Sequence, residues 1–274
     1  MRRVLPRQPL AFLCAGLIIS TLVGARAAPI TRLSYDADAP VVELFEGIDQ
    51  GLFEVRVVMN DEYRGRVFVH NTSDQPQTEE VPKAVVGIHV LKQIGGPFST
   101  GQAGPLNQPF GQNNTAYGPA QAAAGQLSPS GSQSPTFNSF NGPGPSFFTI
   151  PPEKTVQLQM SSVCIDHGKP APIPRMSYLL RRLDQHTANR ALVKLIENAD
   201  RQKTDRLALQ AAAWHLANRM SWDDLTRKTV TVGAGVQRRL FAPAHLEAAR
   251  ALVDAAHAAV ASVDKSQIAD RAKE

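Results

Sequence analysis

The stretch LFEVRVVM, residues 52–59, decides the fold class because its apolar side chains alternate with charged ones. Successive side chains of a β-strand point to opposite faces, so Glu54 and Arg56 would share one face. The other face would hold Phe53, Val55, Val57 and Met59. One apolar and one charged face are typical of an antiparallel sheet that covers a core on one side.

Similar short segments lie on both sides of this stretch, spaced by roughly ten residues. No amphipathic segment of helical length separates them, which disfavours alternating strands and helices. We therefore expect an α+β fold class, with an immunoglobulin-like antiparallel β-sandwich over residues 38–165 and a small helical C-terminal part. The expected strands are Val41–Phe45, Leu52–Met59, Gly65–Asn71, Ala84–Leu91, Phe147–Ile150 and Val156–Met160.

A low-complexity insertion interrupts the expected sandwich at residues 93–146. Its 54 residues contain 10 Gly, 8 Pro and no Asp, Glu, Lys, Arg or His. Its scattered aromatic residues follow no period, so they form no face whose burial could offset the conformational entropy of the chain. We expect a disordered Gly/Pro/Asn/Gln-rich insertion between two strands of one domain.

The periodicity changes to helical after Ser177, which predicts a helical domain over residues 175–230. Within it, Thr204–Met220 is rich in strong helix formers. Ser221 and Asp224 have the spacing of a helix-capping pair, so a short helix should begin there.

A separate C-terminal helix is expected over residues 243–273. Gly233 and Gly235 interrupt the preceding pattern, and Pro243 suits the first position of a new helix. The apolar stripe of this last helix is narrow. It is therefore either a lightly docked arm or half of an interface with another chain.

The N-terminal residues 1–27 have the three parts of a secretory signal peptide. A basic start is followed by an apolar run at Leu10–Val23 and by the small-residue motif Ala25-Arg26-Ala27. The run of 14 residues is shorter than the ~20 that span a bilayer. We expect cleavage after Ala27 and a secreted or periplasmic chain with no membrane span.

The basic charge of the chain lies mainly in this leader. The formal net charge is +5, but loss of residues 1–27 leaves 25 basic and 24 acidic residues. In the remaining chain no stretch combines dense Lys and Arg with interleaved aromatic residues. Nucleic acid is therefore not an expected partner.

Cys164 is the only cysteine left once the leader with Cys14 is removed. It is buried and inert, paired between chains, or chemically committed. In the segment VCIDHGKP, residues 163–170, a cysteine hydrolase would use Cys164 as nucleophile with His167 and Asp166. Structural zinc needs four ligands, and no second Cys/His pair is present, so neither a metal nor a cofactor is expected.

A hydrolase triad could also draw its other members from elsewhere in the chain. His215 is an alternative base, and Asp223 an alternative carboxylate. One sequence does not show whether these side chains converge. The alternative to any such chemistry is structural: Cys164 ends a strand, and the following turn leads to a proline-rich crossing.

Gln210 is the second notable polar residue, because its helical neighbours are mainly small or apolar. Leu207, Ala213, Trp214 and Ala217 lie three or four positions away from it. A buried amide at this place requires hydrogen-bond partners. The partner is either a backbone carbonyl of the sandwich or Cys164 itself.

Two resemblances follow from these segments. Over most of residues 41–228 the chain resembles uncharacterised secreted proteins of planctomycete-type bacteria, through Val69-His70-Asn71-Thr72, Cys164 to Pro170, and Gln210 to Asn218. This resemblance implies no known activity. Locally, Cys164, Gln210 and Trp214 are similar to the thioester domains of bacterial surface adhesins, which implies a Cys164–Gln210 cross-link that acylates amines on a partner.

These observations favour binding over catalysis. No complete catalytic motif is present, and a sandwich with long polar loops presents surfaces. We expect a secreted or periplasmic envelope protein with a binding or structural role and an unknown protein or cell-envelope partner. The alternatives are a thioester-type covalent adhesion module that uses Cys164 and Gln210, and a cysteine-dependent hydrolase.

Overall fold

The computed structural model describes residues 28–30, 33–90, 120–129, 146–200 and 203–271. The expected leader and most of the expected insertion lie outside these residues. The strands are β1 Val41–Glu43, β2 Phe53–Met59, β3 Arg64–Asn71, β4 Gln77–Val81, β5 Val85–His89, β6 Ala123–Pro129, β7 Ser146–Ile150, β8 Thr155–Cys164, β9 Tyr178–Arg182, β10 Thr229–Val232 and β11 Val236–Arg239. The helices are α1 Leu44–Asp49, α2 Leu183–His186, α3 Arg190–Asn198, α4 Arg206–Asn218, α5 Trp222–Arg227 and α6 Pro243–Arg271.

The central unit is a closed barrel with the strand order β2-β3-β8-β6-β5-β9, and all its described pairings are antiparallel. The expectation of an immunoglobulin-like sandwich is therefore wrong, although the α+β class is correct. Strand β9 closes the barrel because it pairs with β5 along its length and with β2 at Val57 and Tyr178. This strand lies in the region expected to be helical. Its inward residues are Tyr178 and Leu180.

Strand β6 overturns a second expectation, because it lies inside the insertion expected to be disordered. It pairs with β5 on one side and with β8 on the other. Its small residues allow this close fit: a Cβ at Gly125 would come within 2.1 Å of the Ser161 carbonyl oxygen. At Gly125, at least one of the glycines that predicted disorder meets a steric demand of the barrel wall.

A small sheet with the order β1-β4-β7 lies beside the barrel. Its central strand β4 is parallel to β1 and antiparallel to β7. Phe148 and Ile150 of β7 are fully buried in the same apolar cluster as the residues inside the barrel. Barrel and sheet therefore share one core.

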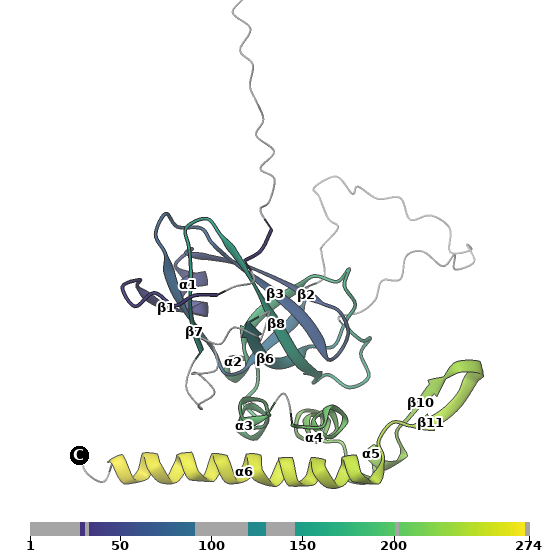
Figure 1. Ribbon diagram of the computed structural model, residues 1–274. Helices are drawn as coiled ribbons and strands as arrows, with labels where there is room; N and C mark the ends of the chain where they lie inside the picture. Colours follow the sequence, from purple (N-terminus) through teal and green to yellow (C-terminus); the bar gives the residue numbers. More distant parts are fainter. Residues whose placement is uncertain (1–27, 31–32, 91–119, 130–145, 201–202, 272–274) are drawn as a thin grey trace, which may run out of the picture.

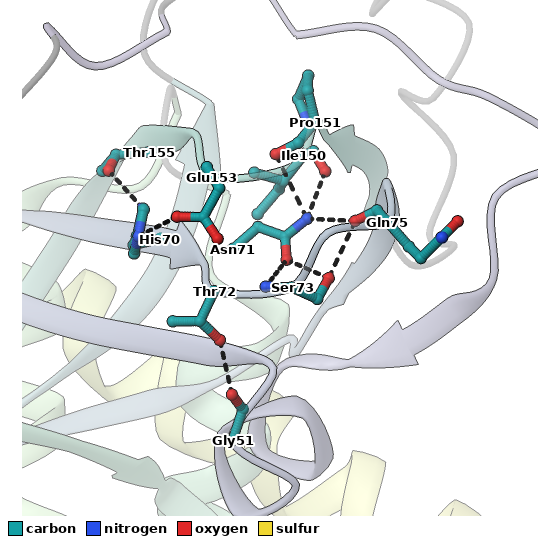
Figure 2. A network of polar contacts seen from close by, with 10 residues as sticks. All are labelled: Gly51, His70, Asn71, Thr72, Ser73, Gln75, Ile150, Pro151, Glu153 and Thr155. Atoms are coloured by element: carbon teal, nitrogen blue, oxygen red, sulfur yellow. Dashed lines mark hydrogen bonds and ion pairs between the residues drawn. The ribbon is translucent and has the colours of Figure 1, made fainter.

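The Asn71 side chain ties the end of β3 to this small sheet (Figure 2). It is fully buried, and its Nδ2 donates to the carbonyl oxygens of Gln75 at 2.8 Å and Ile150 at 2.9 Å. Its Oδ1 accepts a hydrogen bond from the Ser73 backbone N–H at 3.0 Å. The segment around Asn71, which carries part of the resemblance to secreted proteins, thus has a structural role at this corner.

Helices α3 and α4 cover one outer face of the barrel, and α6 runs along their far side (Figure 1). A second apolar cluster joins these helices to Val86, Ala124 and Val163 of the barrel wall. The predicted helix starts are confirmed: Ser221 accepts a hydrogen bond from the Asp224 backbone N–H, and Pro243 begins α6. The buried face of α6 holds Leu246, Ala249, Val253 and Ala256.

None of the helices in the described part of the chain is long and apolar enough to cross a membrane.

Candidate functional site

The barrel and the helices meet at the end of β8, where Cys164 faces α4. Cys164 and Gln210 are 46 positions apart in the sequence and form two hydrogen bonds. The Cys164 backbone N–H donates to Gln210 Oε1 at 2.9 Å, and Gln210 Nε2 donates to the Cys164 carbonyl oxygen at 2.7 Å. The structure thus brings together the two residues of the predicted pair.

The Gln210 amide bonds to the backbone of Cys164 in the way that a peptide group of a neighbouring strand would. Its side chain is only 1% exposed, so the two hydrogen bonds replace solvation that the amide loses on burial. Both backbone groups of Cys164 are satisfied by the same amide. This geometry fixes α4 against the barrel at one defined point.

The Cys164 thiol is buried at this contact. Burial raises its pKa to about 12, and the nearby carboxylates of Glu62, Asp166 and Asp61 add to the effect. A nucleophilic cysteine needs a lowered pKa, so that thiolate is present at neutral pH. The environment of Cys164 therefore does not favour the hydrolase.

The turn after Cys164 uses the other predicted residues as structural ties. Asp166 Oδ2 accepts from the Ala122 backbone N–H at 3.3 Å and from Lys169 Nζ at 2.7 Å. The His167 backbone N–H donates to Asn218 Oδ1 at 3.2 Å. The turn is thus bound to Ala122, just before β6, and to Asn218 at the end of α4.

His167 and Trp214 pack edge to face, with ring centroids 4.7 Å apart. His167 Nε2 and Trp214 Nε1 are buried, and neither has a hydrogen-bond partner among the described residues. Burial and the charge of Lys228 lower the pKa of His167. A neutral imidazole is therefore expected at this apolar contact.

The alternative triad members are placed at other points of the helical part. His215 stacks on Trp222 at a centroid distance of 4.2 Å, and its Nδ1 lies 2.8 Å from the Met220 carbonyl oxygen. Asp223 is exposed in the first turn of α5. His215 and Asp223 therefore have other contacts, and the structure does not bring them together with Cys164 in a triad.

Gln126 forms a second glutamine tie that the sequence reasoning missed. From β6 its Nε2 donates to the carbonyl oxygens of Ala199 at 2.9 Å and Glu197 at 3.2 Å, at the C-terminal end of α3. These carbonyls have no partner within the helix. The sequence did not indicate this role of Gln126, because the surrounding Gln/Asn-rich composition is typical of loops.

The hairpin formed by β10 and β11 is the second feature that sequence reasoning missed. It projects from the helical part beside α5 and the start of α6 (Figure 1). Residues 229–239 are exposed without exception. The alternation of valine and threonine in this segment indicates a strand, but the glycines of its turn were interpreted as the end of the helical pattern.

The two faces of this hairpin differ in character. The pairings Val230–Arg238 and Val232–Val236 place three valines on one face. The opposite face is polar, and on it Gln237 Nε2 donates to Thr231 Oγ1 at 2.7 Å. Val230, Val232 and Val236 have exposed fractions of 37%, 40% and 57%, so a large part of this apolar face is open to solvent.

The base of the hairpin is firmly anchored and basic. Leu225 and Phe241 on either side of it are buried, and the Leu240 backbone N–H donates to the Lys228 carbonyl oxygen at 2.9 Å. An open pocket of about 280 Å³ lies there, with two arginines, Arg239 and Arg250, and one carboxylate, Glu247, in its lining. The hairpin is therefore a fixed projection with an apolar face and a cationic base.

Comparisons with protein-family models, with curated proteins and with solved structures find no match.

Proposed function

We propose that this chain is a secreted or periplasmic envelope protein with a binding or structural role, and that the β10–β11 hairpin is its binding element. The observation that carries this proposal is the apolar face of Val230, Val232 and Val236 in solvent. Exposed apolar surface on a projecting element is typical of interaction sites. Removing such surface from water is favourable, so a partner would stabilise the hairpin.

The attachment of the hairpin supports the same role. A two-stranded hairpin is at best marginally stable by itself in water. Here its two ends are anchored by the buried Leu225 and Phe241. The barrel and the helices are in turn joined at Gln210 and Gln126. The molecule thus holds the apolar face at a fixed place, which reduces the entropy cost of binding.

Fractionation of cells that express the chain with its leader tests this function. We expect the exported protein to begin at Ala28 and to sediment with the envelope. The variant V230T/V232T/V236T keeps β-branched side chains but loses apolar surface, so it should move into the soluble exported fraction. I268T, at an exposed apolar residue of α6, is the matched control. Equal sedimentation of the triple variant and the control would contradict the proposal.

A second candidate is the thioester-type adhesion module, which the hydrogen-bonded approach of Gln210 to Cys164 supports. In the cross-linking step Cys164 Sγ would bond to Cδ of Gln210. Nε2 would leave as ammonia, taking up the thiol proton. An amine of the partner would then displace the thiol from Cδ and form an amide. The step would also break the hydrogen bond from Gln210 Nε2 to the Cys164 carbonyl oxygen.

The intact mass of the mature chain distinguishes this candidate under denaturing, non-reducing conditions. A cross-linked chain would be lighter by one ammonia, would resist thiol alkylation and would gain the mass of an added small amine. Q210A should abolish all three signs. The full mass with one alkylatable thiol would exclude the thioester and leave the binding role in place.

A further inference from the structure

The largest group of exposed apolar residues in the described chain lies on the β10–β11 hairpin, and the others lie singly elsewhere. The hairpin holds Val230, Val232 and Val236, and the edge strand β1 holds Val41 with an exposed fraction of 55%. Figure 1 shows β1 and the hairpin on opposite sides of the molecule. One molecule therefore presents an apolar hairpin face and, on the opposite side, an edge strand with an exposed valine.

Both surfaces are open strand edges. Strand β1 is the terminal strand of its sheet and pairs with β4 on one side only. Strands β10 and β11 pair only with each other in the described part of the chain. An edge strand presents backbone N–H and C=O groups that another strand can bind. Strand β1 has three residues and β11 has four, so β11 is long enough to pair along the whole of β1.

The charges of the two surfaces are complementary. From Leu33 to Val55 the chain contains six acidic residues and no basic one. Five of the six are exposed, namely Asp36, Asp38, Glu46, Asp49 and Glu54, and the sixth, Glu43, is paired with Arg182. From Leu225 to Leu246 the chain contains Arg227, Lys228, Arg238 and Arg239 and no acidic residue, while Asp224, which pairs with Arg227, and Glu247 lie just outside this range.

We propose that the hairpin binds the β1 edge of a second copy of this chain, with β11 pairing to β1. The valine face would cover Val41, and Arg238 on this face and Arg239 on the opposite one would lie near the exposed carboxylates. This inference rests on the proposed function, because it names the partner of the same hairpin. The contact is heterologous: each molecule has one donor hairpin and one acceptor edge, so association continues head to tail.

An anionic lipid surface is the other occupant that a basic, apolar hairpin could fit. Lipid would explain the hairpin but not the acidic, apolar strand edge on the other side of the molecule. A second copy explains both surfaces with one contact. The lipid surface is therefore an outcome of the test.

Sedimentation velocity of the mature chain over a range of concentrations tests the contact. We expect oligomers of increasing size at low salt and weaker association at high salt. The donor variant V230T/V232T/V236T and the acceptor variant V41K should each be monomeric, with dissociation constants raised about tenfold or more. I268T and L179K make comparable changes at exposed residues elsewhere and should associate like the unchanged chain.

Mixing the two variants gives the sharper result. The donor variant keeps an intact β1 edge and the acceptor variant an intact hairpin, so an equimolar mixture should form one-to-one heterodimers that grow no further. A monomeric unchanged chain at all concentrations would overturn the inference. So would association that persists in V41K, which would indicate a symmetric hairpin contact.

Binding to vesicles of zwitterionic and anionic phospholipid without self-association would also overturn it, in favour of the lipid surface. These outcomes differ from failure of the proposed function. If the purified chain is monomeric but the triple valine variant still leaves the envelope fraction, the hairpin has another partner. If the variant stays in the envelope fraction, the proposed function itself fails.

Discussion

The side chain of Gln210 forms two hydrogen bonds with the backbone of Cys164, and through them α4 is joined to the end of β8. The amide is oriented by its partners, since Oε1 accepts from an N–H and Nε2 donates to a C=O. Because all four groups are buried, each bond is costly to lose. Together with the Gln126 contact to α3, this pair fixes the helices, and with them the hairpin, on the barrel.

Replacing Gln210 by methionine should therefore destabilise the whole protein. Q210M keeps the length of the side chain but leaves the N–H and C=O of Cys164 buried without partners, at a cost of about 2 to 5 kcal/mol. Urea denaturation measures the change in the free energy of unfolding. Q267M, at an exposed position of α6, should change it little. Equal stability of Q210M and the control would show that the pair contributes nothing.

Cys164 should be inert in the folded protein. Its side chain is 1% exposed and its pKa is raised to about 12, so little thiolate is available near neutral pH. We expect a maleimide to label the native mature chain at least ~100-fold more slowly than the denatured chain. S266C supplies an exposed thiol on α6 as a control. Rapid labelling of the native chain would show that the thiol is accessible.

Asn71 should tolerate no acidic replacement. The Nδ2 of Asn71 donates to the carbonyl oxygens of Gln75 and Ile150, and N71D would set a carboxylate oxygen against both. We expect a loss of about 3 kcal/mol or more in the free energy of unfolding. N60D, in an exposed turn, makes the same change without burial. Thermal unfolding that is equal for both variants would contradict this role of Asn71.

Gly125 should be required for the barrel wall. A Cβ at this position would lie 2.1 Å from the Ser161 carbonyl oxygen and 2.8 Å from the Ser162 Cα, so β6 and β8 would have to separate. G125A should cost about 2 kcal/mol or more. G233A, where a Cβ meets no atom within 4 Å, is the matched glycine control. Chemical denaturation of both variants compares them directly.

Glu79 should make stability decrease as pH rises. This carboxyl is fully buried in β4 without a hydrogen-bond partner among the described residues, and burial, followed by the charge of Glu43, raises its pKa to about 8. In the unfolded chain the ordinary value is 4.5. Between these two values the folded state holds a proton that the unfolded state releases.

The stabilising effect of the bound proton is therefore complete below the unfolded pKa and is lost progressively up to about pH 8. E79Q removes this dependence and should be more stable than the unchanged chain at alkaline pH, with the difference vanishing in acid. Melting temperatures measured from acid to mildly alkaline pH give the result. E80Q is the control on the same strand, and an E79Q difference independent of pH would contradict the expectation.

The parts of the fold that depend on local sequence could be predicted. The strand at residues 52–59, the cap at Ser221 and the helix start at Pro243 follow from short patterns, and the structure confirms them. The barrel could not be predicted, because its closure depends on β6 and β9. Gly125 in β6 is required by its contact with β8, which is distant in the sequence. Such a requirement produces no periodic pattern in the sequence of β6 itself.

The site could also be predicted only where it depends on local sequence. Helical spacing placed small and apolar residues around Gln210, which correctly indicated burial and a need for partners. The identity of the partner depended on how β8 packs against α4. The hairpin was missed because Gly233 and Gly235 of its turn interrupt the alternation of valine and threonine that would predict a strand.

Binding of purified mature chain to isolated cell envelopes measures the role of the hairpin most directly. The bound fraction is determined by sedimentation as protein concentration increases, for the unchanged chain, V230T/V232T/V236T and the control I268T. We predict saturable binding that the control retains and the triple variant loses by about tenfold or more in affinity. Binding curves that coincide for all three proteins would contradict the assignment of the hairpin as the binding element.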